Sequence, residues 1–143
     1  MEQAAFIDTN IFIRYLTKDD PVKYRACLSL FKKAESNKAI LTTSESVVAE
    51  VVFVLSSRKH YGPSRKQIQV ALSRLLILPG FRVSNHGVFI RALGIYAQHT
   101  IDFEDCLTIA HMEQAHMKIL YSYDQDFDRL ENILRQEPEV QQS

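Results

Sequence analysis

The sequence of 143 residues lacks several features that would assign it to a particular class of protein. It has only two cysteines, Cys27 and Cys106, which are too few for a disulfide framework and are not spaced as zinc ligands. No apolar run approaches the roughly 18 residues that are needed to span a membrane. The N-terminus has neither the basic region nor the long apolar run of a signal peptide. We therefore expect a cytoplasmic protein with no membrane segment, whose two thiols are buried in apolar helices.

Acidic residues are absent from one stretch of the chain. The net charge is zero, but residues 51–100 contain seven Lys and Arg and no Asp or Glu. Residues 1–100 carry a net charge of +7, and residues 101–143 carry −7. This asymmetry is a reason to consider a polyanionic partner such as a nucleic acid. Taken alone, the uneven distribution of charge is explained more simply by helix faces that are exposed to solvent.

Length and composition indicate one globular domain. Hydrophobic residues make up 46% of the chain and charged residues 24%, and there is no internal repeat. Short apolar runs alternate with helical patterns, which predicts an α/β fold with three layers, α/β/α, around a small parallel sheet. We expect this domain to cover residues 1–134, and a polar, frayed tail to cover 135–143. The expected strands cover residues 4–7, 39–41, 81–83 and 119–122.

Six helices are expected between and after these strands. Capping boxes at Thr42–Glu45 and Ser64–Gln67 predict where two of them begin. In a capping box, the side chain of a hydroxyl residue and that of an acid or amide three residues later each accept a hydrogen bond from the other residue's backbone N–H. Pro21 suits the first turn of another, where its missing N–H is not needed. The helices are expected to cover about 10–18, 21–36, from the first capping box to about 59, 64–78, 84–99 and 102–116.

The first acidic candidate is Asp8. It follows the apolar run Ala4–Ile7 and precedes Thr9 and Asn10. In parallel α/β sheets, ligands bind beyond the carboxyl ends of the strands, where Asp8 would lie. The alternative is that Asp8 only caps the helix that follows.

The second candidate, Glu50, interrupts the apolar run Val47–Leu55. Seven of these nine residues are large and apolar, so the helix is expected to be buried nearly all round. A charge within such a helix is costly unless it is paired or binds a cation. The alternative is a narrow solvated stripe formed by Ser46, Glu50 and Ser57.

Two further acidic segments follow. Asp102 and Glu104 suit the start of a helix, as an N-cap and as an acid near the positive end of the dipole. Asp105 is less well explained in this way, because it falls within the helix. Asp124 follows the apolar run Ile119–Tyr121 and repeats the arrangement of strand and aspartate seen at Asp8.

These four acids define a chemical hypothesis. In a parallel sheet, strand ends and the helix starts that follow them share one edge, so Asp8, Asp105 and Asp124 could converge there, with Glu50 reaching them from its helix. Clustered carboxylates repel each other and cannot all stay ionised without a cation. Mg²⁺ or Mn²⁺ suits oxygen ligands and can activate water for attack on a phosphodiester. The sequence therefore predicts a metal-dependent nuclease, with basic residues holding the nucleic acid backbone.

The chain resembles the PIN domain family, and within it the VapC-type ribonuclease toxins of bacterial toxin–antitoxin pairs. The resemblance covers about residues 4–130. It rests on four segments that occur in order: Asp8–Asn10 with Arg14–Leu16, Ala49–Val51 with Leu55, Asp102–Leu107, and Ser122–Phe127. The third segment has Cys106 where the family usually has Ala. The fourth has Ser122 where Thr is common.

The resemblance implies roles for individual residues. Asp8 and Asp105 would be the principal metal ligands, with Glu50 completing the site or positioning water and Asp124 binding the metal directly or through water. Thr9 or Asn10 would orient Asp8. Asp126 would assist the metal or cap the segment after it, and Arg14 would contact an RNA phosphate or be a solvated surface residue. The implied activity is a Mg²⁺- or Mn²⁺-dependent endoribonuclease, and the implied partners are an RNA substrate, a cognate antitoxin protein and a second copy of the chain.

Three other interpretations compete with this one. A phosphatase of the haloacid dehalogenase type would need an aspartate two residues after Asp8, where this chain has Asn10. A response-regulator receiver would need a lysine at the end of a late strand, but Lys118 precedes the last strand. A catalytically silent PIN-like module that binds RNA or protein would have no need of four mutually repelling acids.

Overall fold

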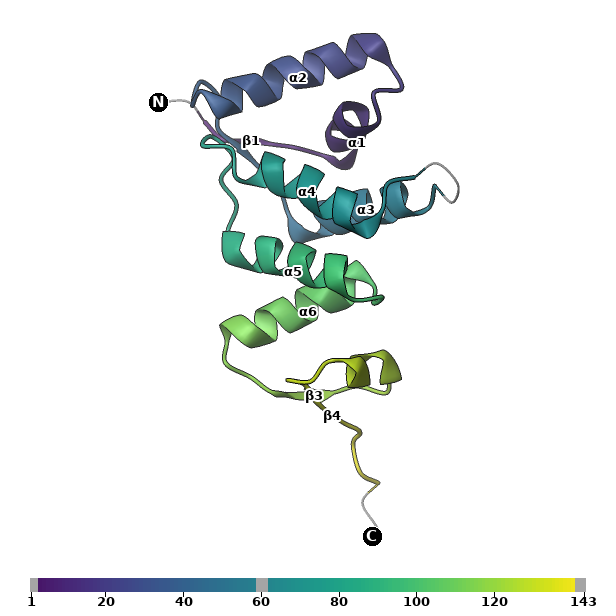
Figure 1. Ribbon diagram of the computed structural model, residues 1–143. Helices are drawn as coiled ribbons and strands as arrows, with labels where there is room; N and C mark the ends of the chain where they lie inside the picture. Colours follow the sequence, from purple (N-terminus) through teal and green to yellow (C-terminus); the bar gives the residue numbers. More distant parts are fainter. Residues whose placement is uncertain (1–2, 59–61, 141–143) are drawn as a thin grey trace.

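The computed structural model describes residues 3–58 and 62–140 of the chain (Figure 1). Parallel strands and helices occur in the predicted alternating order, which confirms the α/β class and is consistent with the three-layer fold of PIN domains. The elements are β1 (Ala5–Phe6), α1 (Thr9–Thr17), α2 (Pro21–Glu35), β2 (Leu41–Thr42), α3 (Glu45–Ser56), α4 (Arg65–Leu76), α5 (His86–Gln98), α6 (Phe103–Gln114), β3 (Ile119–Tyr121), the 3-10 helix η1 (Gln125–Arg129) and β4 (Leu134–Gln136).

The described strands form two separate parallel sheets of two strands each. In the first sheet, β1 pairs with β2, with Ala5 opposite Leu41. An isolated parallel bridge between Leu41 and Phe81 extends this sheet, and it is all that forms of the strand expected at residues 81–83. In the second sheet, β3 pairs with β4, with Ile119 opposite Leu134.

Helices α5 and α6 lie between the two sheets (Figure 1). Helices α1 and α2 lie beside β1 at one end of the molecule, and β3 and β4 lie beyond α6 at the other end. A bidentate ion pair holds α5 to α6, with Arg91 Nε 2.7 Å from Glu113 Oε2. The strand β1, which ends two residues before Asp8, and the strand β3, which ends three residues before Asp124, are therefore on different sides of this helix pair.

The hydrophobic core follows the predicted apolar stripes. Three aromatic side chains, Phe12, Phe31 and Phe81, pack together with ring centroids 6.0 to 6.5 Å apart. They join α1, α2 and the Phe81 bridge around the β1–β2 sheet. Cys27 and Cys106 are both buried and unpaired thiols, as expected.

One of the two predicted capping boxes forms. The Ser64 hydroxyl accepts a hydrogen bond from the Gln67 N–H, and the Gln67 side chain accepts one from the Ser64 N–H. At α3 the cap is Ser44, whose hydroxyl accepts from the Val47 N–H at 3.2 Å, so the prediction at Thr42 was wrong. Thr42 is instead part of β2, and pairing with β1 delays the start of the helix. The predicted end of this helix near Lys59 lies outside the described residues, and α3 ends at Ser56.

The C-terminal segment is ordered further than the sequence predicts. The tail expected from Arg135 begins inside strand β4, so Arg135 and Gln136 are paired with β3. Arg135 donates hydrogen bonds to Asp128, Glu137 and the carbonyl of Ser122. Asp128 and Ser122 lie 7 and 13 residues from Arg135, so these two contacts leave no local pattern in the sequence.

Among the residues that the structure describes, no helix is both long and apolar enough to cross a membrane.

Candidate active site

Asp8 occupies the N-cap position of α1, two residues after the end of β1. Its backbone is extended, with φ −90° and ψ 168°, but its carboxylate makes no capping hydrogen bond. The side chain is exposed. The capping interpretation therefore explains the position of Asp8 and leaves its carboxylate available for another role.

Glu50 is linked to the same strand end through Thr9. The Thr9 hydroxyl donates a hydrogen bond of 2.7 Å to Oε2 of Glu50. Thr9 is only 7% exposed, so its hydroxyl is held in a fixed position against the carboxylate. The sequence suggested that Thr9 or Asn10 orients Asp8, whereas the structure shows Thr9 orienting Glu50.

The surroundings of Glu50 differ from the prediction of a helix buried nearly all round. Glu50 is exposed, and Ser46, Phe53 and Ser57 on the same face of α3 are exposed as well. The opposite face, with Val48 and Val51, is fully buried. The expected burial on nearly all sides was wrong, and the alternative of a solvated stripe formed by Ser46, Glu50 and Ser57 is confirmed. The exposed face also includes the large Phe53, which a count of apolar residues in the run does not reveal.

Asp105 lies in the first turn of α6 among other acids. Partial burial raises its pKa, and the nearby carboxylates of Asp124, Asp102, Asp126 and Glu104 raise it further. Asp102 is the N-cap of α6, as predicted, but its side chain makes no capping bond. The start of α6 and the start of η1 thus bring together carboxylates that repel one another.

Asp124 caps the short helix η1. Its Oδ1 accepts a hydrogen bond of 2.9 Å from the Asp126 N–H, and its own N–H donates to the Ser122 hydroxyl. Asp126 is 3.5 Å from the guanidinium of Arg129. The capping role that the sequence offered to Asp126 therefore belongs to Asp124, and Asp126 forms a surface ion pair.

Arg14, the candidate phosphate contact, is partly exposed and lies 3.2 Å from Asp19. It lines a shallow groove of about 350 Å³ together with Asn10, Lys23 and Cys27. An incoming phosphate would compete with Asp19 for this guanidinium.

The four predicted acids thus form two groups in the single chain. Asp8 and the Thr9–Glu50 pair belong to one group, and Asp105 and Asp124 belong to the other. Within residues 3–58 and 62–140, no three or more His, Cys, Asp or Glu side chains are placed to hold a metal ion together. The carboxylate oxygens are the ligands that Mg²⁺ and Mn²⁺ prefer, but their arrangement in one chain does not complete a site.

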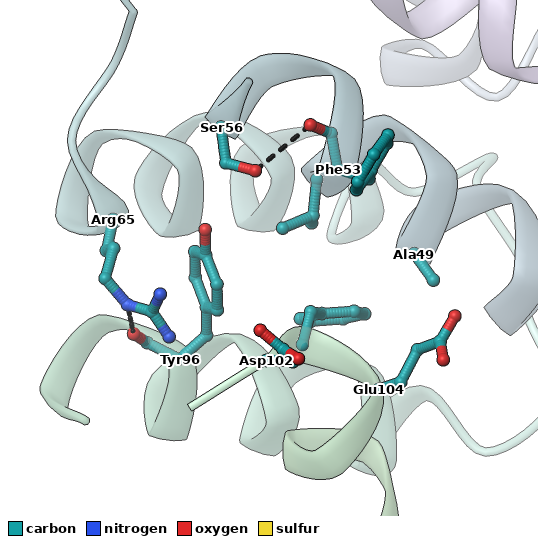
Figure 2. Close-up of a pocket in the computed structure, with 9 residues that line it drawn as sticks. Ala49, Phe53, Ser56, Arg65, Tyr96, Asp102 and Glu104 are labelled. Atoms are coloured by element: carbon teal, nitrogen blue, oxygen red, sulfur yellow. Dashed lines mark hydrogen bonds between the residues drawn. The ribbon is translucent and has the colours of Figure 1, made fainter. Parts of the chain in front are cut away.

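A pocket of about 300 Å³ lies beside the second acidic group (Figure 2). Arg65 and Tyr96 line one end, and Glu104 lines the other. The Arg65 guanidinium lies 3.6 Å from the centroid of the Tyr96 ring and donates to the carbonyls of Tyr96 and Ile101. The sequence analysis did not single out Arg65, because one arginine among seven basic residues carries no distinguishing pattern.

The chain thus combines parallel strands and helices with acids at strand and helix ends. The family model of the PIN domain matches residues 5–133. The chain therefore belongs to the PIN domain family, whose members are generally nucleases that hydrolyse phosphodiester bonds and typically use divalent metal ions. No curated protein matches the chain.

Proposed function

We propose that this protein is a metal-dependent endoribonuclease and the toxin component of a VapBC-type toxin–antitoxin pair. Membership of a nuclease family supports the reaction class. The observation that carries the proposal is the arrangement around Asp105, where partial burial and the four neighbouring carboxylates of Asp124, Asp102, Asp126 and Glu104 raise the pKa of the Asp105 carboxyl. Repulsion between these carboxylates destabilises the fold, and a bound cation would offset it. Cation binding therefore explains why the carboxylates lie together.

The residues have separate parts in this proposal. Asp8 and Asp105 are proposed as metal ligands, and Glu50 and Asp124 as further ligands or as groups that position water. Thr9 holds Glu50 through its 2.7 Å hydrogen bond. When bound, Mg²⁺ or Mn²⁺ would supply a water of lowered pKa and positive charge beside the phosphate.

RNA is the proposed substrate, and exposed basic residues would hold its backbone. Arg58, Arg74 and Arg82 are exposed, and no ion pair to them occurs among the described residues. Arg14 is a further candidate if phosphate displaces Asp19. The proposed protein partners are a cognate antitoxin that covers the acidic site and a second copy of the chain.

The test is cleavage of a labelled mixed RNA pool by purified protein, with Mg²⁺, with Mn²⁺ and with EDTA. We expect cleavage only with a metal ion, and a loss of at least about 100-fold in Asp8→Asn, because a metal ligand is removed. Glu35→Gln is the matched control, since Glu35 is an exposed carboxylate on α2 that lies outside the proposed site. Equal cleavage by Asp8→Asn and Glu35→Gln would contradict the proposal.

A catalytically silent module that binds RNA or protein is the second candidate. The observation that favours it is the division of the acids into two groups that do not hold a metal in one chain. It predicts RNA binding without cleavage and no heat of binding when Mn²⁺ is added in a calorimeter. Mn²⁺ binding that is lost in Asp8→Asn would exclude it.

A further inference from the structure

The pocket between α3 and α6 has an exposed aromatic ring on one side (Figure 2). Phe53 lines it from α3 and is 72% exposed. Ala49 and Val52, on the same helix, and Phe103, on α6, line it as well and are buried. A ligand in this pocket would therefore rest against apolar walls and cover the open face of an aromatic ring.

The pocket has the size of one small planar group. Its volume of about 300 Å³ is at the lower end of the roughly 300–1,000 Å³ found for small-ligand sites. Tyr96 and Phe103, which both line it, pack edge to face with their ring centroids 5.9 Å apart. Aromatic side chains favour a flat, unsaturated ligand that can stack.

Polar groups stand at the two ends of this pocket. At one end, the Arg65 guanidinium is fixed by the Tyr96 ring and by the carbonyls of Tyr96 and Ile101. On the α6 side, Asp102 and Glu104 are exposed, and neither carboxylate forms an ion pair among the described residues. Free carboxylates accept hydrogen bonds and donate none when ionised, so they favour a ligand that supplies N–H donors.

The pocket adjoins the residues proposed to bind the metal ion. Phe53 follows Glu50 by three residues on α3, and side chains with this spacing are neighbours on one helix face. Glu104 directly precedes Asp105 in the first turn of α6. A nucleotide next to the bond that is cut could therefore place its base in the pocket.

The four bases of RNA differ in the donors on their Watson–Crick edges. Guanine has two adjacent donors there, the N1–H and the N2 amino group. Adenine and cytosine place an acceptor nitrogen beside their amino group, and uracil places its one N–H between two carbonyls. A carboxylate accepts two parallel N–H bonds and is repelled by an acceptor, so guanine suits it best.

We propose that this pocket binds an unpaired guanine of the RNA substrate. The base stacks on Phe53, and its N1–H and N2 amino group donate to the carboxylate of Glu104. Stacking on aromatic side chains together with hydrogen bonds to the base edge is the usual way in which single-stranded RNA is read. The inference rests on the proposed function for the identity of the RNA as a substrate. It makes Phe53 and Glu104 specificity residues, which select the RNA and take no part in the chemistry.

The first test measures binding of short labelled RNAs by fluorescence anisotropy. The probes are pentamers of uridine that carry guanine, adenine, cytosine or uracil at the central position, and EDTA prevents cleavage. We expect wild-type protein to bind the guanine pentamer about 10-fold more tightly than the others. Inosine lacks the N2 amino group and should lose most of this preference. The 7-deaza analogue of guanine keeps both donors and should bind as guanine does.

The second test removes the carboxylate. Glu104→Gln presents an amide N–H to the base, so its preference for guanine should fall below about 2-fold. Measurement in EDTA separates this effect from any change in metal binding at the neighbouring Asp105. Glu35→Gln changes an exposed carboxylate on α2 and should keep the full preference.

The third test removes the aromatic ring. Phe53→Ala should weaken the binding of all four pentamers by about 10-fold, because every base can stack on a ring. Phe53→Tyr keeps the ring and should bind as the wild type does. Tyr121→Ala, on β3, removes an aromatic residue that is 63% exposed outside the pocket and should also leave the affinity unchanged. Circular dichroism verifies that each variant is folded.

The outcomes separate this inference from the proposed function. Equal affinity for the guanine and uracil pentamers, or a preference that persists in Glu104→Gln, would overturn the guanine pocket. Free GMP that binds as tightly as the guanine pentamer would overturn RNA as the source of the base. Wild-type protein that cuts RNA but shows no guanine preference would leave the nuclease function standing. A guanine preference that is lost in Glu104→Gln, in a wild-type protein that cuts no RNA with any metal ion, would support the pocket and overturn the nuclease function.

Discussion

The hydroxyl of Thr9 donates a 2.7 Å hydrogen bond to Oε2 of Glu50, across 41 positions of the sequence. It joins the start of α1 to the middle of α3, directly beside Asp8. Thr9 is buried while Glu50 is exposed, so a rigid donor holds a carboxylate that would otherwise move freely in solvent. Thr9 thus acts as a positioning residue in the proposed site.

Replacing Thr9 tests this role. Thr9→Val keeps the size of the side chain and removes the donor, so RNA cleavage is expected to fall by about 10- to 100-fold. Thr9→Ser keeps the hydroxyl and should retain most of the activity. The fall should appear in kcat, with little change in the affinity for RNA, because Thr9 holds a site residue and does not touch the substrate. An equal loss in Thr9→Ser would show that packing, not the hydrogen bond, matters.

Asp105→Asn is expected to stabilise the metal-free protein. Burial and neighbouring carboxylates raise the pKa of Asp105, which means that folding disfavours its charged form. The penalty is present above the folded pKa and disappears as the pH falls through it. With EDTA at pH 7, the Tm of Asp105→Asn should therefore be higher by about 1–2 °C, an effect limited by solvent screening. This difference should shrink on acidification.

The control for this prediction is Asp19→Asn. The pKa of Asp19 is lowered, by the Thr17 hydroxyl and the Arg14 guanidinium, so folding favours its charged form. Its replacement should leave the Tm unchanged or lower it slightly at pH 7. A Tm shift of the same sign in both variants would show that removing negative charge anywhere has this effect.

Gly80 and Gly94 are expected to respond to alanine in opposite ways. A Cβ at Gly80 would overlap the carbonyl oxygens of Ala39 and Ala34, the latter at 2.7 Å, and both belong to backbone that cannot easily move. Gly80→Ala should therefore reduce the free energy of unfolding by about 3 kcal/mol. Gly94 lies within α5, where the nearest atom to a new Cβ is 3.9 Å away, so Gly94→Ala should add about 0.5–1 kcal/mol. Urea unfolding measures both values.

Cys106 is expected to be inert in the folded protein. Its side chain is fully buried, and burial raises the pKa of the thiol to about 12. At pH 8 only about one thiol in 10,000 would then be the reactive thiolate. Iodoacetamide should leave Cys106 unmodified in native protein and alkylate it fully in urea, as measured by mass spectrometry. Rapid alkylation without urea would mean that α6 opens readily.

Patterns among neighbouring residues predicted the fold class and several helix starts. The alternation of short apolar runs and helices defined the α/β class, because strand and helix periodicities are properties of neighbouring residues. Ser64 and Gln67 formed the predicted capping box for the same reason. The positions of Asp8 and Asp102 at helix starts were also readable, since N-caps favour aspartate.

Contacts between distant segments were not readable in this way. The start of α3 shifted from Thr42 to Ser44 because β2 pairs with β1. Arg135 was placed in a tail, yet it pairs with Asp128 and lies in a strand. Arg65 stacks on Tyr96, 31 residues away, and no sequence pattern predicts this contact.

The sequence by itself determined the six helices, the strands β1, β2 and β3 and the acids that stand near their ends, because periodicity, capping and charge act over a few residues, whereas β4 was not predicted. Only the tertiary structure decided that Glu50 faces solvent and is held by Thr9, that Asp105 lies with Asp124, and that the strands divide between two sheets. These relationships depend on how the helices α3, α5 and α6 pack, and packing is a property of surfaces brought together from the whole chain.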